Sequence, residues 1–378
     1  MSFPLFEHIL TSMSFDRLFE PFSVRDKLSL PNRLVMAPMT TISGEADGSF
    51  SLQEIEYLER RAASGIGLIM TAACYVHKSG HSFDHQVGCH NDEMLPRLTQ
   101  CAGAINRHGA ASFLQIHHGG NAAREEYTGR PPMAPSAVMN RRQTSEMPRA
   151  MTESEIDEII HAFGDAAGRA QKAGFTGIEI HGANTYLFQQ FFSPFTNKRT
   201  DRWGCQSMED RCRFAVETIR AIRAVVGDHY PVAYRISPEE PEPDGYSTYD
   251  AIELLKRIVP LGIDIVDVSG WEYGTALRND LPSGMHPTLL IRRAMPPDIA
   301  VIGVGGIKLP DQAMAVLQEG IDLVAMGKAL LLNADWAERV LAGQIESIRT
   351  AASTREEITS LEIPVRMRNY VERFFLNP

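Results

Sequence analysis

The sequence predicts an α/β protein: a (β/α)8 TIM barrel with loop insertions, an N-terminal extension and a C-terminal helical tail. Short apolar runs rich in β-branched residues alternate with amphipathic segments, and no low-complexity tract or Gly/Ser linker divides the 378 residues. A single barrel with insertions reaches this length. We therefore expect an extension at 1–17 and one domain at 18–378. A doubly wound open sheet gives a similar alternation and is the competing fold.

Eight apolar runs are the candidate strands, and most are nearly continuous, as expected of parallel strands that are buried on both faces. They span 34–39, 67–72, 111–117, 177–181, 231–236, 263–269, 300–303 and 322–327. Between them, Thr152 and Glu155 form a capping box at a helix start, and Pro310 suits the first turn of another helix. The polar stretch at 119–151 is too long for a simple connector. We expect it to be a loop insertion over the active end of the barrel.

Composition and charge exclude several classes of protein. The net charge of −10 argues against general nucleic-acid binding, because phosphate contact needs a basic face. No apolar run approaches the roughly 20 residues that span a bilayer, and the N-terminus lacks the marks of a signal peptide. The five cysteines are scattered without a C-x-x-C pair, which fits reduced thiols in a cytosol. We expect a cytoplasmic, metal-free protein that acts on a small molecule.

The most informative polar residues are His181, Asn184 and Tyr186, which follow the fourth predicted strand. In a barrel of this type, functional side chains lie at the C-terminal ends of the strands. Two hydrogen-bond donors and a phenol within six residues suit the binding of a carbonyl-like oxygen and the delivery of a proton beside it. Taken alone, the three residues are better explained as a core histidine and packing side chains, so other parts of the chain must decide.

Two further polar residues lie inside predicted strands. Arg235 should meet an anion or the polar edge of a cofactor, or else form a structural ion pair. Gln115 is either an amide satisfied by the backbone or a donor–acceptor pair that recognises a planar heterocycle. The adjacent His117 and His118 lack the carboxylate or cysteine that would complete a metal motif, so we interpret them as structural.

Glycines after the last two predicted strands indicate a phosphate site. Gly305 and Gly306 would let the backbone approach an anion, and Lys328 after Gly327 supplies positive charge. The spacing does not fit G-x-G-x-x-G, which disfavours a dinucleotide-binding fold. Glycines that merely turn the chain are an equally good explanation.

With these residues assembled, the chain resembles the old yellow enzyme family of FMN-dependent ene-reductases. The resemblance runs from about residue 18 to about residue 341, through NRLVMAPMT (32–40), HGANTYL (181–187), SPFTNKRTDRWG (193–204), the GVGG turn and MGKAL. It implies the barrel fold, tightly bound FMN, and NADH or NADPH as the hydride donor. It further implies that the isoalloxazine ring is lined by Pro38, Met39, Thr40, Ala72, Gln115 and Arg235, and that the phosphate is held by Gly305, Gly306, Gly327 and Lys328.

The resemblance also implies an activity. The enzyme would reduce the activated C=C bond of α,β-unsaturated carbonyl or nitro compounds in two half-reactions, with hydride passing from flavin N5 to Cβ. His181 and Asn184 would hold the substrate oxygen while Tyr186 protonates Cα. One departure is Lys328, where the family usually has Arg, because lysine offers a point charge in place of a two-pronged grip.

Two other functions compete with this one. An FMN-dependent amine or saturated-ring dehydrogenase or demethylase on the same barrel ranks second, because the His/Asn pair favours an oxygen-bearing acceptor. A non-flavin phosphate-binding barrel such as an aldolase or isomerase ranks third. The physiological substrate and the formation of a homo-oligomer are open. So is the role of the aromatic C-terminal segment, which would either cap the barrel or join subunits.

Overall fold

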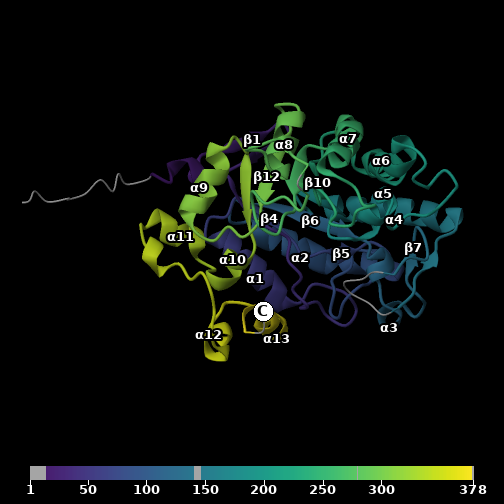
Figure 1. Cartoon of the computed structure of the whole chain (residues 1–378). Coiled ribbons are helices and arrows are strands. Elements are labelled where there is room, and N and C mark those ends of the chain that lie inside the picture. Colours follow the sequence, from purple (N-terminus) through teal and green to yellow (C-terminus); the bar gives the residue numbers. More distant parts are fainter. Residues whose placement is uncertain (1–13, 140–145, 279, 377–378) are drawn as a thin grey trace, which may run out of the picture.

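A computed structural model describes residues 14–139, 146–278 and 280–376 (Figure 1). Within them, eight parallel strands form a closed barrel: β3 (Leu34–Met36), β4 (Leu68–Met70), β6 (Ala111–His117), β9 (Gly177–Gly182), β10 (Val232–Ile236), β11 (Ile265–Val268), β12 (Ala300–Val304) and β13 (Leu323–Met326). Each strand pairs with the next along the chain, and β13 pairs with β3, which closes the sheet. The predicted (β/α)8 barrel is thus confirmed, and the open sheet is excluded.

Helices follow the barrel strands and form a layer around the outside of the barrel. These helices are α1 (Leu52–Ala63), α2 (Leu95–Asn106), α4 (Glu153–Lys172), α6 (Met208–Val226), α7 (Thr248–Ile258), α8 (Pro287–Ala294), α9 (Pro310–Gln318) and α11 (Trp336–Leu341). The predicted capping box begins α4, where Thr152 Oγ1 accepts from Glu155 N at 3.2 Å. Pro310 is in the first turn of α9, as predicted. The helices and the outward-facing strand residues share one buried apolar cluster.

Alternate strand residues fill the interior of the barrel. Towards the N-terminal ends of the strands they are apolar, and they form one cluster with the hairpin of β1 (Phe22–Val24) and β2 (Leu28–Leu30). The hairpin therefore closes that end of the barrel. Towards the opposite end the inward-facing positions become polar, and the buried ones include Gln115, His117, Glu179, His181, Arg235 and Asp267.

The insertion after β6 is built from short elements: η4 (Gly120–Ala122), α3 (Glu125–Thr128), and a parallel pair of β7 (Met133–Ala134) and β8 (Arg149–Ala150). Arg124 N donates to His81 O at 3.1 Å, and Lys198 N donates to Ser136 Oγ at 2.8 Å. The insertion therefore packs on the loops that follow β4 and β9. Both loops leave the C-terminal end of the barrel, which is the position predicted for this insertion.

The C-terminal tail contains α12 (Arg355–Thr359) and α13 (Val365–Phe375), drawn in yellow near α1 in Figure 1. Val365 N donates to Gln53 Oε1 at 3.0 Å, and Arg366 Nη1 donates to Gly44 O at 2.9 Å. The tail thus contacts the segment that leaves the C-terminal end of β3. In this chain it covers one side of the barrel mouth.

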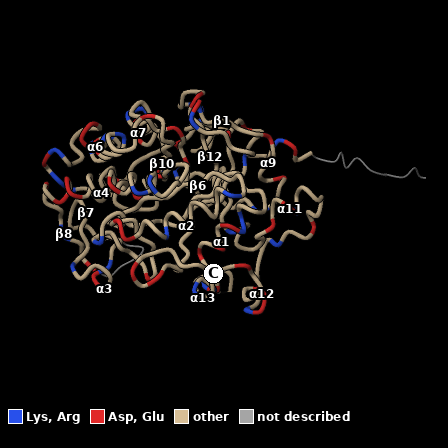
Figure 2. The backbone as a smooth tube through the Cα atoms, turned by 180° about the vertical axis from the view of Figure 1, so that it is seen from behind, with Lys and Arg blue, Asp and Glu red and all other residues tan. Residues whose placement is uncertain are grey.

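Acidic and basic residues are interspersed along the outer helices (Figure 2). None of the helices in the described ranges has the length and apolarity that crossing a membrane requires. The same residues contain no cluster of three or more His, Cys, Asp or Glu side chains that could hold a metal ion.

Candidate active site

The end of β9 brings the predicted trio to the barrel mouth. Backbone φ angles of 58° at Asn184 and 67° at Thr185 turn the chain sharply before α5 (Leu187–Phe192). The ring of Tyr186 therefore lies beside the ring of His181, with centroids 4.9 Å apart. His117 of β6 completes the group, with its ring edge-on to Tyr186 at 4.3 Å. Interpreting His117 as structural was thus incomplete, because it contacts the candidate site.

His181 is a neutral hydrogen-bond donor. Burial, with a contribution from the positive charge of Arg235, lowers the pKa of His181 to about 3. Its Nδ1 accepts from Ala183 N at 3.4 Å, so the ring proton belongs on Nε2. At neutral pH the side chain can therefore donate one hydrogen bond from Nε2.

Arg235 and Asn184 belong to one polar chain. Arg235 is buried and forms an ion pair with Asp267 of β11, which is the structural alternative left open by the sequence. Its Nη2 also donates to Ser269 Oγ at 2.9 Å, and Ser269 Oγ donates to Asn184 Oδ1 at 3.3 Å. Because the amide oxygen of Asn184 is engaged, its NH₂ group is the part that can serve a ligand.

Gln115 is not satisfied by the backbone alone, because its Nε2 donates to Glu179 Oε1 at 2.7 Å. Its backbone N donates to Thr71 Oγ1 at 3.1 Å, and Thr71 precedes Ala72 at the end of β4. Glu179 and Asp267, the acids beneath the site, were missed from the sequence. A signal existed, since each is the one charged residue within a β-branched apolar run, GIEIH and IVDVS.

The remaining residues expected to line the ring follow β3 and are partly exposed: Pro38, Met39 and Thr40. A side chain added at Gly327, after β13, would place its Cβ 3.1 Å from the sulfur of Met39, so these two strand ends adjoin. Burial raises the pKa of Tyr370 on α13, and a hydrogen bond with the Thr40 side chain opposes that rise. Tyr370 therefore reaches Thr40 from the C-terminal tail, which fits the barrel-capping alternative that the sequence left open for this aromatic segment.

The glycine turn after β12 is open and conformationally demanding. Gly305 and Gly306 have φ angles of 136° and 63°, which side chains disfavour. A Cβ at Gly305 would lie 2.5 Å from Tyr273 N, whereas the nearest atom to a Cβ at Gly306 is 3.4 Å away. The turn packs against the β11–α8 loop and still leaves its second glycine accessible. Lys328, in α10 (Lys328–Leu332), follows the neighbouring strand β13.

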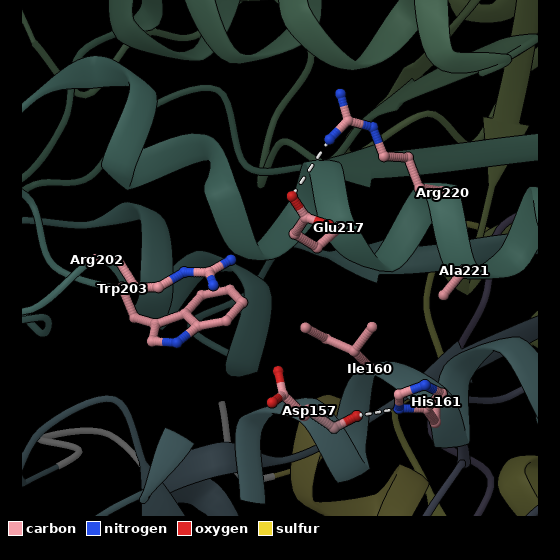
Figure 3. Close-up of a pocket in the computed structure, with 8 residues that line it drawn as sticks. All are labelled: Asp157, Ile160, His161, Arg202, Trp203, Glu217, Arg220 and Ala221. Atoms are coloured by element: carbon pink, nitrogen blue, oxygen red, sulfur yellow. Dashed lines mark hydrogen bonds and ion pairs between the residues drawn. The ribbon is translucent and has the colours of Figure 1, made fainter. Parts of the chain in front are cut away.

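A pocket of about 250 Å³ lies elsewhere, on the outer helical layer between α4 and α6 (Figure 3). Asp157 and Glu217 lie among Arg202 and Arg220, and the guanidinium of Arg202 stands 4.7 Å from the ring centre of Trp203. The pocket is separate from the strand ends and contains none of the predicted site residues.

The strand ends thus define a cofactor-binding barrel, and the residues present fit FMN. A buried arginine and an amide offer polar contacts for a heterocycle, and a thioether and small side chains follow other strands at the same end of the barrel. An accessible glycine turn follows β12, and Lys328 follows the neighbouring strand β13. The chain belongs to the NADH:flavin oxidoreductase / NADH oxidase family, whose model matches residues 17–346.

The chain is also similar to individual oxidoreductases. The chain is 38% identical over 343 residues to the probable NADH-dependent flavin oxidoreductase YqiG of Bacillus subtilis, covering 88% of this chain and 90% of that protein. It is 38% identical over 360 residues to the NADH:fumarate oxidoreductase of Klebsiella pneumoniae, covering 92% of this chain but 38% of that longer protein. The solved morphinone reductase–tetrahydroNAD complex superposes with a TM-score of 0.75 at 28% identity, covering 86% of this chain and 90% of that one.

These matches confirm the resemblance to old yellow enzymes. They also confirm the class of enzyme, an oxidoreductase with FMN as its cofactor and NADH or NADPH as its hydride donor.

Proposed function

We propose that the protein reduces the activated C=C bond of α,β-unsaturated carbonyl or nitro compounds. The observation that carries this proposal is the grouping of His181, Asn184 and Tyr186, two neutral N–H donors and a phenol, at one strand end. Relatives named NADH:fumarate oxidoreductase and NADH:acrylate oxidoreductase support it, because both named substrates carry a C=C bond conjugated to a carboxylate.

The two donors act on the acceptor oxygen. Hydrogen bonds from His181 Nε2 and the Asn184 amide draw electron density from the double bond and stabilise the enolate-like charge that develops on oxygen. Removing one donor of this kind typically costs about 2.7–4 kcal/mol of barrier. Both donors are fixed before substrate arrives, His181 by Ala183 N and Asn184 by Ser269.

Tyr186 supplies the proton to Cα. A phenol keeps its proton at neutral pH, which is the state that a donor needs. The edge-on ring of His117 and the neighbouring ring of His181 hold the tyrosine in place, at 4.3 and 4.9 Å between centroids. Bound FMN would supply the hydride to the other carbon.

We assign the cofactor contacts to the residues that surround this grouping. Gln115 and Arg235 would meet the polar edge of the ring, and Gly305, Gly306, Gly327 and Lys328 would hold the phosphate. Pro38, Met39, Thr40 and Ala72 would lie along the ring. The burial of Arg235 and the accessible turn at Gly306 support the assignment.

Tyr186→Phe tests the proposal, with the two half-reactions followed separately by stopped-flow absorbance. We expect the oxidation of reduced enzyme by cyclohexenone to slow far more than flavin reduction by NAD(P)H. Tyr249→Phe, at an exposed phenol on α7, is the matched control and should change neither. Equal losses in both half-reactions would remove Tyr186 from the proton-donor role. Oxidation of N-methyl amino acids without reduction of cyclohexenone would favour the demethylase instead.

A further inference from the structure

Four polar side chains form a layer inside the barrel, directly below the candidate site. They come from consecutive strands: Gln115 of β6, Glu179 of β9, Arg235 of β10 and Asp267 of β11. Both acids have no exposed surface. One oxygen of each is engaged, since Glu179 Oε1 accepts from Gln115 Nε2 at 2.7 Å and Asp267 Oδ2 accepts from Arg235.

The other carboxyl oxygen of each acid has no hydrogen-bond donor within the described part of the chain. These atoms, Glu179 Oε2 and Asp267 Oδ1, are both buried. On the intervening strand β10, the residue opposite Glu179 is Ala233, whose methyl group leaves room for the two carboxyl groups to meet. Side-chain hydrogen bonding between Glu179 and Asp267 requires that one of them carries a proton.

The surrounding charges decide whether Glu179 is more stable as a neutral acid or as a carboxylate. Two ionised acids and one arginine would leave a net negative charge in a closed, apolar barrel, which is costly. Burial raises the pKa of Glu179 well above its usual range, the charge of Asp267 raises it further, and Arg235 and Gln115 act in the opposite direction. The neighbouring histidines bring no positive charge, because burial lowers the pKa of both His181 and His117.

We propose that Glu179 is a neutral carboxylic acid in the working enzyme, and that its proton, lying between Glu179 Oε2 and Asp267 Oδ1, is a positioning element for the FMN site. The proton makes the four-residue layer electrically neutral and lets Glu179 hold the amide of Gln115. It also leaves Asp267 as the one ionised acid of the layer, with its charge balanced by Arg235. The proposal rests on the FMN site and is independent of which alkene is reduced.

The test uses the FMN-loaded enzyme and its Glu179→Gln variant. An amide at position 179 can donate to Asp267 and accept from Gln115, as the neutral acid does, so it copies the proposed state. We expect an infrared difference spectrum at pH 7 to contain a carboxylic-acid C=O band that Glu179→Gln removes. The flavin midpoint potential should stay unchanged, because no charge is altered. Absence of the band, or a clear rise in the potential, would show that Glu179 is ionised and overturn the proposal.

Two further variants separate positioning from simple folding. Glu179→Ala removes the hydrogen bonds of Glu179 with Gln115 and Asp267 and should weaken the retention of FMN on dilution. Glu179→Gln should restore this retention, and equal loss in both variants contradicts the proposal.

Glu54→Gln is the matched control for the infrared spectrum. Burial raises the pKa of Glu54 only to about 7, so its band should disappear as the pH rises above that value. The Glu179 band should persist over the same range, and a band that disappears together with that of Glu54 would also contradict the proposal.

Discussion

Glu54 on α1 should make the stability of the protein depend on pH in a defined direction. Its carboxyl group is completely buried and accepts from Thr41 Oγ1 at 2.7 Å, and Thr41 directly follows Thr40 in the sequence. Burial raises the pKa of Glu54 from its ordinary 4.5 to about 7, and the hydrogen bond from Thr41 opposes the shift. In the unfolded chain the group titrates near its ordinary value.

The direction in which stability changes with pH follows from the number of protons that the folded and unfolded states bind. Between pH 4.5 and about 7 the folded state keeps the proton that the unfolded state has lost, so stability falls as the pH rises. One pKa unit corresponds to about 1.4 kcal/mol, so a shift of this size amounts to about 3 kcal/mol. The contribution of Glu54 is fully present below pH 4.5 and is lost by about pH 7.

Glu54→Gln isolates this contribution, because glutamine does not titrate. In urea unfolding at a fixed FMN concentration, the free energy of unfolding of the wild type relative to the variant should fall by about 3 kcal/mol between pH 4.5 and 7 and then level off. Glu56→Gln, at an exposed position on the same helix, should change the free energy by less than about 0.5 kcal/mol at every pH. A difference that is constant with pH, or that rises, would refute the reasoning.

Two other variants test the site. Asn184→Ala should lower kcat/KM for alkene reduction by about 10²–10³ while flavin reduction by NAD(P)H changes much less, because it removes a preorganised donor; similar losses in stopped-flow traces of both half-reactions would contradict this. Gly305→Ala should reduce the FMN content of the purified protein, measured by absorbance, because the added Cβ would lie 2.5 Å from Tyr273 N. Gly274→Ala, also at positive φ but in open space, should retain FMN.

The fold could be predicted from the sequence because its signals are local. Each barrel strand is an apolar run that ends near Gly, Pro or a polar residue, and some intervening helices, such as α4, carry a capping signal of their own. The strand ends differ from the predicted ends by a few residues, as at β3, which stops at Met36 while the apolar run continues to Met39. A strand extends only as far as its backbone hydrogen bonds with the neighbouring strands. The hydropathy of the sequence indicates burial and does not show where this pairing stops.

The site was only partly predictable because its contacts cross the barrel. His181, Asn184 and Tyr186 are close in sequence and could be recognised as a group. Arg235 left two alternatives open, and the pairing of β10 with β11 is what places Asp267 beside it. Tyr370 lies 330 positions from Thr40, and no periodicity relates them.

The enclosure that this fold requires also sets the protonation states of the site. A low dielectric disfavours charged forms, so burial raises the pKa of Glu179 and lowers that of His181 by the same mechanism. Arg235 and Asp267 are buried as a pair, and the donors above them are neutral. A neutral donor loses less free energy than a charged one when a substrate covers it, and its N–H bond still points at the acceptor oxygen. Donors of this kind stabilise charge that develops during a reaction more than charge already present in a bound substrate, and such differential stabilisation is what accelerates a chemical step.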